Sequence, residues 1–188
     1  MEYYLKTPAA NNLIVTVADL KEHLRVTHDL DDTYIGGLLD AAVDKAQQYT
    51  DRQLLPATLV LLLESFDNPV KIKKLPVASI ASVKYYDENN EIQTLSTDIY
   101  QSDIRTEPAI IELKPDQSWP DITSERKYPV EIEFSAGYAD ASKVPDAFKH
   151  AVKLMVGNWY NYRDDLQKPL GMTTPSQNLL DPYKRAII

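Results

Sequence analysis

Three histidines are the residues of this chain best suited to bind a metal ion or to transfer protons. They are His23, His28 and His150. None of their pairs has the i, i+4 spacing that places two imidazoles beside one metal ion on a helix, and we interpret them as surface or capping residues. Cysteine is absent from the chain, which excludes disulfides, thiolate ligands and cysteine nucleophiles. We therefore predict no metal site.

An acidic segment, Asp29 to Asp32, superficially suggests a calcium-binding loop. Such a loop needs a glycine at its sixth position and a bidentate glutamate at its twelfth. Counted from Asp29, those positions hold Tyr34 and Asp40. The segment is better interpreted as a helix cap, in which Asp31 or Asp32 accepts hydrogen bonds at the positive end of a helix.

The sequence motifs of common catalytic sites are also missing. No serine lies in a G-x-S-x-G turn, and the five glycines form neither G-x-G-x-x-G nor a phosphate-binding loop. No pair of carboxylates is singled out for acid–base hydrolysis by its spacing. We predict no catalytic residue and no cofactor, and keep an acid–base hydrolase that uses Asp and Glu as an alternative.

The charge of the chain bears on nucleic-acid binding. The net charge of −8, from 20 basic and 28 acidic residues, disfavours sequence-specific binding, because that requires basic side chains that displace counterions from phosphates. Lys71, Lys73 and Lys74 come nearest to a basic patch, and a solvated strand edge explains them more simply. A DNA-binding module is therefore only a third alternative. A pore through which DNA merely passes needs no basic patch.

The length of 188 residues favours one domain that carries an insert. No apolar run approaches the ~20 residues that span a bilayer. The start of the chain, Met1 to Lys6, lacks a basic region followed by an apolar one. We therefore expect a soluble chain without a secretory signal peptide.

Two amphipathic helices are predicted near the N-terminus. Thr16 to about Val26 forms the first, because Thr16 and Asp19 have the spacing of a capping box. The second runs from Thr33 to Tyr49, where apolar residues recur at helical spacing. Gly36 and Gly37 lie in its first turns and reduce helix stability. Close packing against another backbone would explain these two glycines.

The apolar period then changes to that of β-strands. We predict an antiparallel module of roughly six short strands, with most of the prolines between them. The segments with strand character are Thr58 to Phe66, Val70 to Leu75, Ile80 to Tyr86, Glu91 to Leu95, Asp98 to Ser102, Ala109 to Leu113 and Val130 to Ser135.

Helical spacing returns from Val144 to about Arg163. The predicted class is α+β, a small helical bundle of two N-terminal helices and one C-terminal helix with an inserted antiparallel β module. The predicted parts are an N-terminal arm (1–15), the first part of the helical core (16–53), the β module (54–140), the second part of the helical core (141–166) and a C-terminal tail (167–188).

Aromatic residues and the tail supply candidate interface positions. The simplest interpretation of the Trp159–Arg163 segment has Trp159 and Tyr162 in the core and Tyr160 exposed; the alternative is an interface anchor, since Trp, Tyr and Arg dominate binding hot spots. Trp119 either fills its own β module or docks on a neighbour. We expect the leucine-bearing tail to pack on its own domain or on a neighbouring subunit. The candidate interface residues are Trp119, Trp159, Tyr160, Arg163, Leu179, Leu180, Tyr183, Lys184 and Arg185.

Short stretches from Leu13 to Arg185 occur together in the order found in one protein family. They are Val17–Val26, Asp29–Asp32, Tyr49–Leu54, Leu75–Pro76, Ser79–Val83, Tyr85–Asp87, Gln117–Pro120, Phe134–Tyr138, Val144–Pro145, Trp159–Tyr160 with Arg163, and Leu179–Arg185. In these stretches the chain resembles the head-to-tail connector (head-completion, or adaptor) proteins of long-tailed bacteriophages and prophages, in the branch with a β module inserted in a helical core. Asp51 stands where that family usually has glycine.

The resemblance implies a structural subunit and not an enzyme. Such proteins form a ring beneath the portal at one capsid vertex, extend the DNA channel and receive the next neck or tail component. The implied partners are further copies of the chain, in a dodecamer that would match the portal, the portal protein and a downstream neck or tail-completion protein. DNA is only passing cargo and no membrane is involved. The implied location is the virion neck, after assembly in the bacterial cytoplasm. The main alternative is another neck or tail-completion protein.

Overall fold

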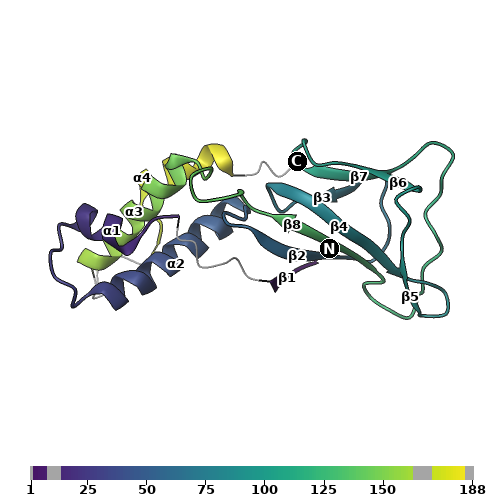
Figure 1. Ribbon diagram of the computed structural model, residues 1–188, viewed down its shortest axis with the longest axis horizontal. Helices are drawn as coiled ribbons and strands as arrows, with labels where there is room; N and C mark the ends of the chain where they lie inside the picture. Colours follow the sequence, from purple (N-terminus) through teal and green to yellow (C-terminus); the bar gives the residue numbers. More distant parts are fainter. Residues whose placement is uncertain (1, 8–13, 163–170, 185–188) are drawn as a thin grey trace. The chain divides into compact units, whose positions relative to one another are not determined.

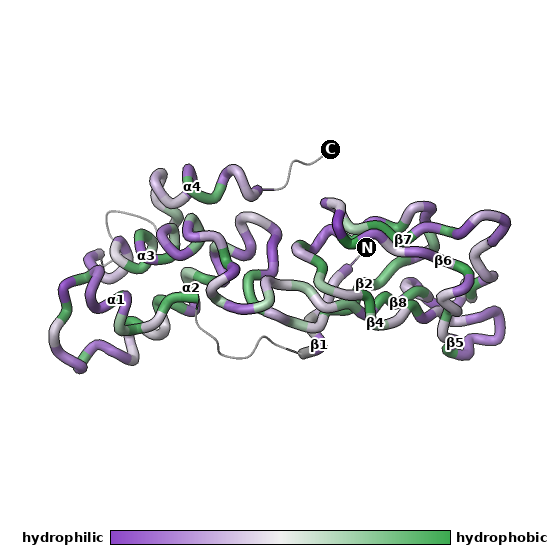
Figure 2. Tube along the Cα trace, turned by 45° about the horizontal axis from the view of Figure 1, so that its top comes forward, coloured by the Kyte–Doolittle hydropathy of each residue, from purple (hydrophilic) through white to green (hydrophobic). Residues whose placement is uncertain are grey.

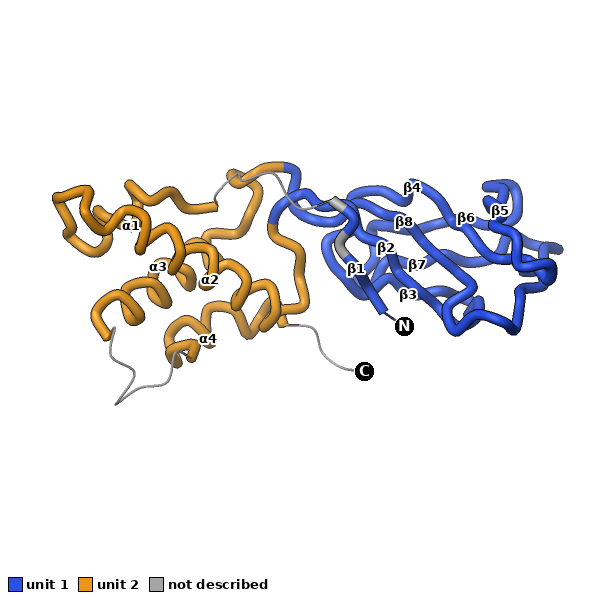
Figure 3. Tube along the Cα trace, turned by 90° about the horizontal axis from the view of Figure 1, so that it is seen from below, with its two compact units in different colours: residues 1–10, 55–139 blue, residues 11–54, 140–188 orange. Residues whose placement is uncertain are grey.

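The computed structural model describes residues 2–7, 14–162 and 171–184. The chain divides into two compact units, which Figure 3 distinguishes by colour. The β unit comprises Met1–Ala10 and Leu55–Ala139, and the helical unit comprises Asn11–Leu54 and Asp140–Ile188. The predicted α+β class, with antiparallel strands between N-terminal and C-terminal helices, is confirmed.

The helical unit is organised around α3 (Asp146–Asn161), which contacts α1, α2 and α4. These three helices are α1 (Val17–Leu24), α2 (Asp32–Thr50) and α4 (Thr174–Leu180), and the 3-10 helix η1 (Asp181–Tyr183) follows α4 (Figure 1). Helix α3 buries one apolar stripe, which includes Phe148, Val152, Met155 and Trp159. Helix α4 lies in the segment that the sequence presented as a tail, so the prediction of one C-terminal helix missed it.

The capping box predicted for α1 is confirmed. Thr16 Oγ1 accepts a hydrogen bond from the Asp19 backbone N–H at 3.0 Å, and Asp19 Oδ2 accepts one from the Thr16 backbone N–H at 2.9 Å. These bonds satisfy N–H groups that the helix itself leaves unpaired. Arg25 ends the helix in the left-handed conformation, with φ at 58°.

Through this cap the stability of α1 depends on pH. The hydrogen bonds from Thr16 lower the pKa of Asp19 below its usual 3.8. Its contribution to the free energy of unfolding is therefore present above pH 3.8 and is lost as the pH falls through the lower folded-state pKa. We expect Asp19→Ala to cost a few tenths to about 1 kcal/mol near neutral pH. Thermal melts should show this difference shrink as the pH falls below 3.8; a pH-independent difference would contradict the prediction.

The predicted cap of α2 is wrong. Asp31 occupies the N-cap position, but its side chain makes no capping hydrogen bond. Its carboxylate accepts instead from the Tyr160 hydroxyl, and Asp32 forms an ion pair with Lys21 at 2.8 Å. Contacts with α3 and α1 therefore take up the carboxylates that the local sequence offered to the helix end.

The close packing predicted at Gly36 and Gly37 does not occur within the described chain. Among the residues that the structure describes, nothing lies within 4 Å of a Cβ atom placed on either glycine. The glycines cost helix stability without admitting another backbone of the same chain. They leave an open strip of surface on the first turns of α2.

The β unit contains two antiparallel sheets. The five-stranded sheet has the order β1-β2-β8-β4-β5, and the three-stranded sheet has the order β3-β7-β6. The strands are β1 (Glu2–Thr7), β2 (Ala57–Leu63), β3 (Val70–Ile72), β4 (Val77–Tyr86), β5 (Ile92–Thr94), β6 (Tyr100–Asp103), β7 (Ala109–Leu113) and β8 (Val130–Ala136).

The two sheets share one apolar core. Strand β8 shows the period-two pattern of a strand with one buried face: Ile132 and Phe134 are fully buried, whereas Glu131 and Glu133 lie on the other face. In Figure 2, hydrophobic stretches recur along the strands and helices, and many of the connections between them are hydrophilic. Burial of alternate residues therefore fixes the register of the central strands.

The N-terminal segment differs from the predicted arm, because Glu2–Thr7 forms β1 and pairs with β2. The Tyr3 ring meets Phe134 edge-on, with 6.2 Å between the ring centroids. The Tyr3 hydroxyl also accepts a hydrogen bond from the backbone N–H of Lys73 at 2.9 Å, just beyond β3. Tyr3 therefore connects the edge of one sheet to the chain that leaves the other.

Gly137 follows β8 at a crowded turn, with φ at +114°. A Cβ atom there would lie 2.3 Å from the Leu55 carbonyl oxygen and 2.8 Å from the Pro56 nitrogen. The Gly137 N–H donates to the Pro76 carbonyl oxygen at 2.9 Å. Only glycine combines this backbone conformation with so close an approach.

Candidate functional site

Trp119 lies against the β unit that carries it. Its ring stacks on Phe66, with 4.6 Å between centroids and 6° between planes, and both side chains are partly buried against the shared core. The sequence left two roles open for Trp119, and in the structure its ring packs within its own β unit.

The aromatic cluster at the end of α3 has a different exposure pattern from the predicted one. Trp159 is buried, and its indole N–H donates to the Gly171 carbonyl oxygen at 3.3 Å. Tyr162 is exposed and Tyr160 is half-buried, the reverse of the expectation, because Tyr160 reaches Asp31 on the neighbouring helix. Arg163 lies outside the described residues.

The candidate residues of the tail pack on the helical unit. Leu180 is fully buried and Leu179 is half-buried. The Tyr183 ring contacts Phe148, with 4.9 Å between centroids, and the Lys184 ammonium lies 4.7 Å from the centroid of the Tyr49 ring. Arg185 lies outside the described residues.

Tyr49 in the last turn of α2 and Arg52 just beyond that helix hold the segment that follows α4. The Tyr49 hydroxyl donates to the Asp181 carboxylate, and this bond raises the pKa of Tyr49. Arg52 Nε donates to the Tyr183 carbonyl oxygen at 3.0 Å. These side chains therefore fix η1 within the helical unit.

Exposed apolar side chains lie where α2 begins, and sequence reasoning missed them. We define the Leu30 patch as Leu30, Tyr34, Gly37 and Tyr160. Leu30 is 89% exposed and Tyr34 is 39% exposed. The centroids of the Tyr34 and Tyr160 rings lie 6.2 Å apart. Gly37 follows Tyr34 by three residues and so lies on the same helix face. The sequence signal that could have found the Leu30 patch is a leucine between aspartates in a turn. A leucine in such a turn is not expected to be buried within its own chain.

Carboxylates stand next to Leu30 in the sequence, at Asp29, Asp31 and Asp32. Lys21 Nζ lies 2.5 Å from Asp29 Oδ1 and 2.8 Å from Asp32 Oδ1. The hydrogen bond with Asp29 is the main reason that the pKa of Lys21 is raised, and Lys21 lowers the pKa of Asp29 in turn. With Asp31 also present, acids outnumber bases around this patch.

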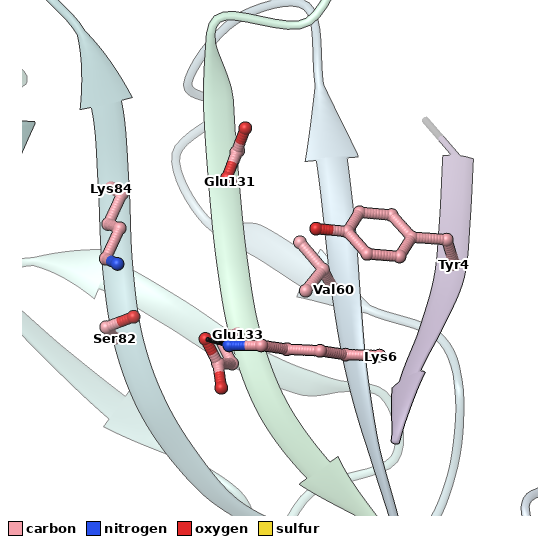
Figure 4. Close-up of a pocket in the computed structure, with 7 residues that line it drawn as sticks. All are labelled: Tyr4, Lys6, Val60, Ser82, Lys84, Glu131 and Glu133. Atoms are coloured by element: carbon pink, nitrogen blue, oxygen red, sulfur yellow. Dashed lines mark hydrogen bonds and ion pairs between the residues drawn. The ribbon is translucent and has the colours of Figure 1, made fainter. Parts of the chain in front are cut away.

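A polar hollow occupies the outward face of the five-stranded sheet (Figure 4). We call it the sheet hollow. Lys6 and Glu133 form an ion pair at 2.7 Å across it, and the hydrogen bond with Glu133 raises the pKa of Lys6. Sequence reasoning missed this site because its parts come from distant strands. The hollow is lined by Tyr4, Lys6, Val60, Ser82, Lys84, Glu131 and Glu133.

The described ranges contain no group of three or more His, Asp or Glu side chains that could hold a metal ion. No helix within them is both long and apolar enough to cross a bilayer. Lys71 is exposed on β3, an edge strand of the three-stranded sheet.

Three solved structures of gene transfer agent (GTA) particles contain a chain with a similar fold. The neck of an empty GTA particle computed with C6 symmetry gives a TM-score of 0.77 at 20% identity. The virion of a native GTA particle gives 0.76 at 21% identity, and the neck of a native GTA particle computed with C12 symmetry gives 0.76 at 20%. Each alignment covers 100% of this chain and 97% of the other.

Sequence comparison identifies the family. No curated protein sequence matches the chain significantly. The family model described as phage gp6-like head-tail connector protein matches residues 14–114, more than half of the chain. This match confirms the resemblance seen in the sequence, and it sets aside the hydrolase alternative because the family is one of structural connectors. The chain belongs to the phage gp6-like head-tail connector family.

Proposed function

We propose that this chain is the subunit of a closed ring in the neck of a phage or phage-like particle. The ring docks beneath the portal at one capsid vertex, extends the DNA channel and receives the next neck or tail component. Family membership supports the proposal, as does the likeness to chains in GTA necks computed with C6 and C12 symmetry. A ring of twelve subunits is compatible with both symmetries.

The observation that carries the proposal is the Leu30 patch. A ring requires a heterologous interface, in which one face of a subunit meets a different face of the next. Exposed apolar groups rimmed by polar residues mark interaction surfaces, and tyrosine is enriched at binding hot spots. The acids around the patch, Asp29, Asp31 and Asp32, call for a basic rim on the opposing face.

The net charge of −8 suits a channel. Negatively charged protein repels the phosphates of DNA. A predominantly acidic ring would let DNA pass without retaining it.

Ring formation is tested by measuring solution mass over a concentration series, with negative-stain imaging of large species, both for the free chain and after addition to portal-bearing heads. We expect wild-type rings in at least one of these settings. Leu30→Asp should lower assembly at least about tenfold with an unchanged thermal melt, because Leu30 is 89% exposed in the single chain. Thr33→Asp, at an exposed neighbouring position, is the matched control. Equal assembly of wild type and Leu30→Asp would remove the Leu30 patch from the interface.

The double substitution Gly36→Ala, Gly37→Ala separates helix stability from assembly. In the single chain each change should stabilise α2 by up to about 0.8–1.0 kcal/mol, because no described atom lies within 4 Å of the added methyl groups. The same methyl groups should hinder a neighbouring subunit that packs on this strip. A raised melting temperature with reduced ring formation is the expected pair of results. Unimpaired assembly would place the strip outside the ring contact.

A second candidate function is that of another neck or tail-completion protein, which would share the fold. Binding discriminates between the two. A connector binds portal-bearing heads that lack tails, whereas a tail-completion protein binds tail tubes in the absence of heads.

A further inference from the structure

The sheet hollow contains one charge pair that is formed and one that is not. Lys6 and Glu133 are joined by an ion pair. Lys84 and Glu131 stand opposite each other on β4 and β8, and within the described chain neither forms an ion pair. Figure 4 shows these two side chains on neighbouring strands with no interaction drawn between them. The hollow therefore offers one ammonium and one carboxylate to an incoming group.

The hollow also has apolar surface. Tyr4, which lines the hollow, is 46% exposed. Val60 on β2 lies opposite Tyr4 on β1 and opposite Glu133 on β8. The charges of Lys6 and Lys84 balance those of Glu131 and Glu133. A strongly charged partner would gain no long-range attraction from such a surface, whereas a partner carrying one acid, one base and an apolar group would match it.

The β unit presents such a combination at the end of β6. Asp103, Ile104 and Arg105 form what we call the β6 tip. Arg105 NH2 lies 2.8 Å from Asp103 Oδ2, and Arg105 Nε donates to Asp103 Oδ1 at 3.0 Å. The Arg105 side chain is still 87% exposed, and Ile104 is 38% exposed. An acid, an apolar group and a base are therefore displayed on three consecutive residues.

We propose that the β6 tip of one copy docks in the sheet hollow of the neighbouring copy. Arg105 pairs with Glu131, Asp103 approaches Lys84, and Ile104 covers Tyr4. Asp103 takes up the Nε side of the Arg105 guanidinium, so its remaining N–H groups are the ones that donate to Glu131. The contact is heterologous, as ring closure requires. It joins the β units of neighbouring copies, whereas the Leu30 patch would join their helical units. It rests on the proposed ring function.

Reversal of charge tests the pairing. Arg105→Glu and Glu131→Arg should each reduce ring assembly at least about tenfold, and the double variant Arg105→Glu, Glu131→Arg should restore it. Lys71→Glu and Glu88→Arg, at exposed positions outside both surfaces, are the matched controls for each change of charge. A merely structural role of Arg105 would not be rescued by Glu131→Arg. Full assembly of both single variants, or no rescue in the double variant, would overturn the contact.

Disulfide trapping provides an independent measurement. The chain has no cysteine, so Ser82→Cys and Thr106→Cys in one chain introduce its only thiols. Oxidised rings should give a ladder of covalent multimers on a non-reducing gel, and the control pair Glu88→Cys, Thr106→Cys should not. Rings without a ladder would overturn this contact and leave the connector function standing. Failure of the wild type to oligomerise either alone or on portal-bearing heads would overturn both.

Discussion

Gly137→Ala should destabilise the β unit by at least about 3 kcal/mol, or prevent it from folding. The added Cβ would lie 2.3 Å from the Leu55 carbonyl oxygen and 2.5 Å from the Leu55 carbonyl carbon. These are backbone atoms, so no side-chain rotation relieves the clash. The φ of +114° adds strain for any residue with a Cβ. The turn cannot move freely, because the Gly137 N–H is bonded to Pro76.

Urea unfolding measures this effect, and the two tryptophans allow each unit to be followed by itself. Trp119 packs in the β unit and Trp159 is buried in the helical unit, so Trp119→Phe and Trp159→Phe backgrounds give separate signals. Gly157→Ala in α3 is the control, since its Cβ would meet His23 at an ordinary 3.5 Å and the change favours helix by up to about 1 kcal/mol. Wild-type stability of Gly137→Ala would contradict the geometry of the turn.

Leu180→Ala should destabilise the helical unit by about 2–5 kcal/mol. Leu180 is fully buried, and its helix α4 packs on α3 and α2. Urea unfolding followed through Trp159 provides the measurement, because the Trp159 indole bonds to Gly171 ahead of α4. Leu179→Ala, at a half-buried position, should cost less.

A truncation tests the role of the C-terminal segment. Removal of all residues after Gly171 should lower both stability and assembly, since it deletes the buried Leu180 and Ser176. A stable unit without α4 would show that the segment is dispensable for folding and would contradict the role of Leu180.

Local signals predicted much of the fold. The Thr16–Asp19 capping box and the apolar periods of α2 and α3 depend on residues within one or two turns, and the structure contains all three features. The strands of the β module were visible as alternating or apolar segments between prolines. Such patterns survive because neighbouring residues of an element must share its buried face.

Features that depend on distant partners were not predictable in this way. Strand β1 pairs with residues more than fifty positions away, and its own six residues show no distinctive period. The Asp31 carboxylate is bound by Tyr160, which is 129 residues distant. Local reasoning assigned that carboxylate to the helix end and assigned Tyr160 to solvent.

The candidate surfaces likewise differ in whether local sequence or distant residues determine them. Sequence composition identified tryptophans and leucines with binding potential, but Trp159 and Leu180 are buried in their own unit. Leu30 was overlooked because its acidic neighbours suggested only a turn. The sheet hollow combines strands β1, β2, β4 and β8, so it exists only once the register of the sheet is known.

The division of the helical unit has a consequence for biosynthesis. Helices α1 and α2 precede the main segment of the β unit and α3 follows it, so nascent α1 and α2 must wait for α3 while all of Leu55–Ala139 is translated. The β unit, completed by β8, can fold on the ribosome before the bundle closes. Until then the apolar faces of α1 and α2 lack their main partner. The helical unit therefore closes last, and a chain that terminates early carries no finished bundle into ring assembly.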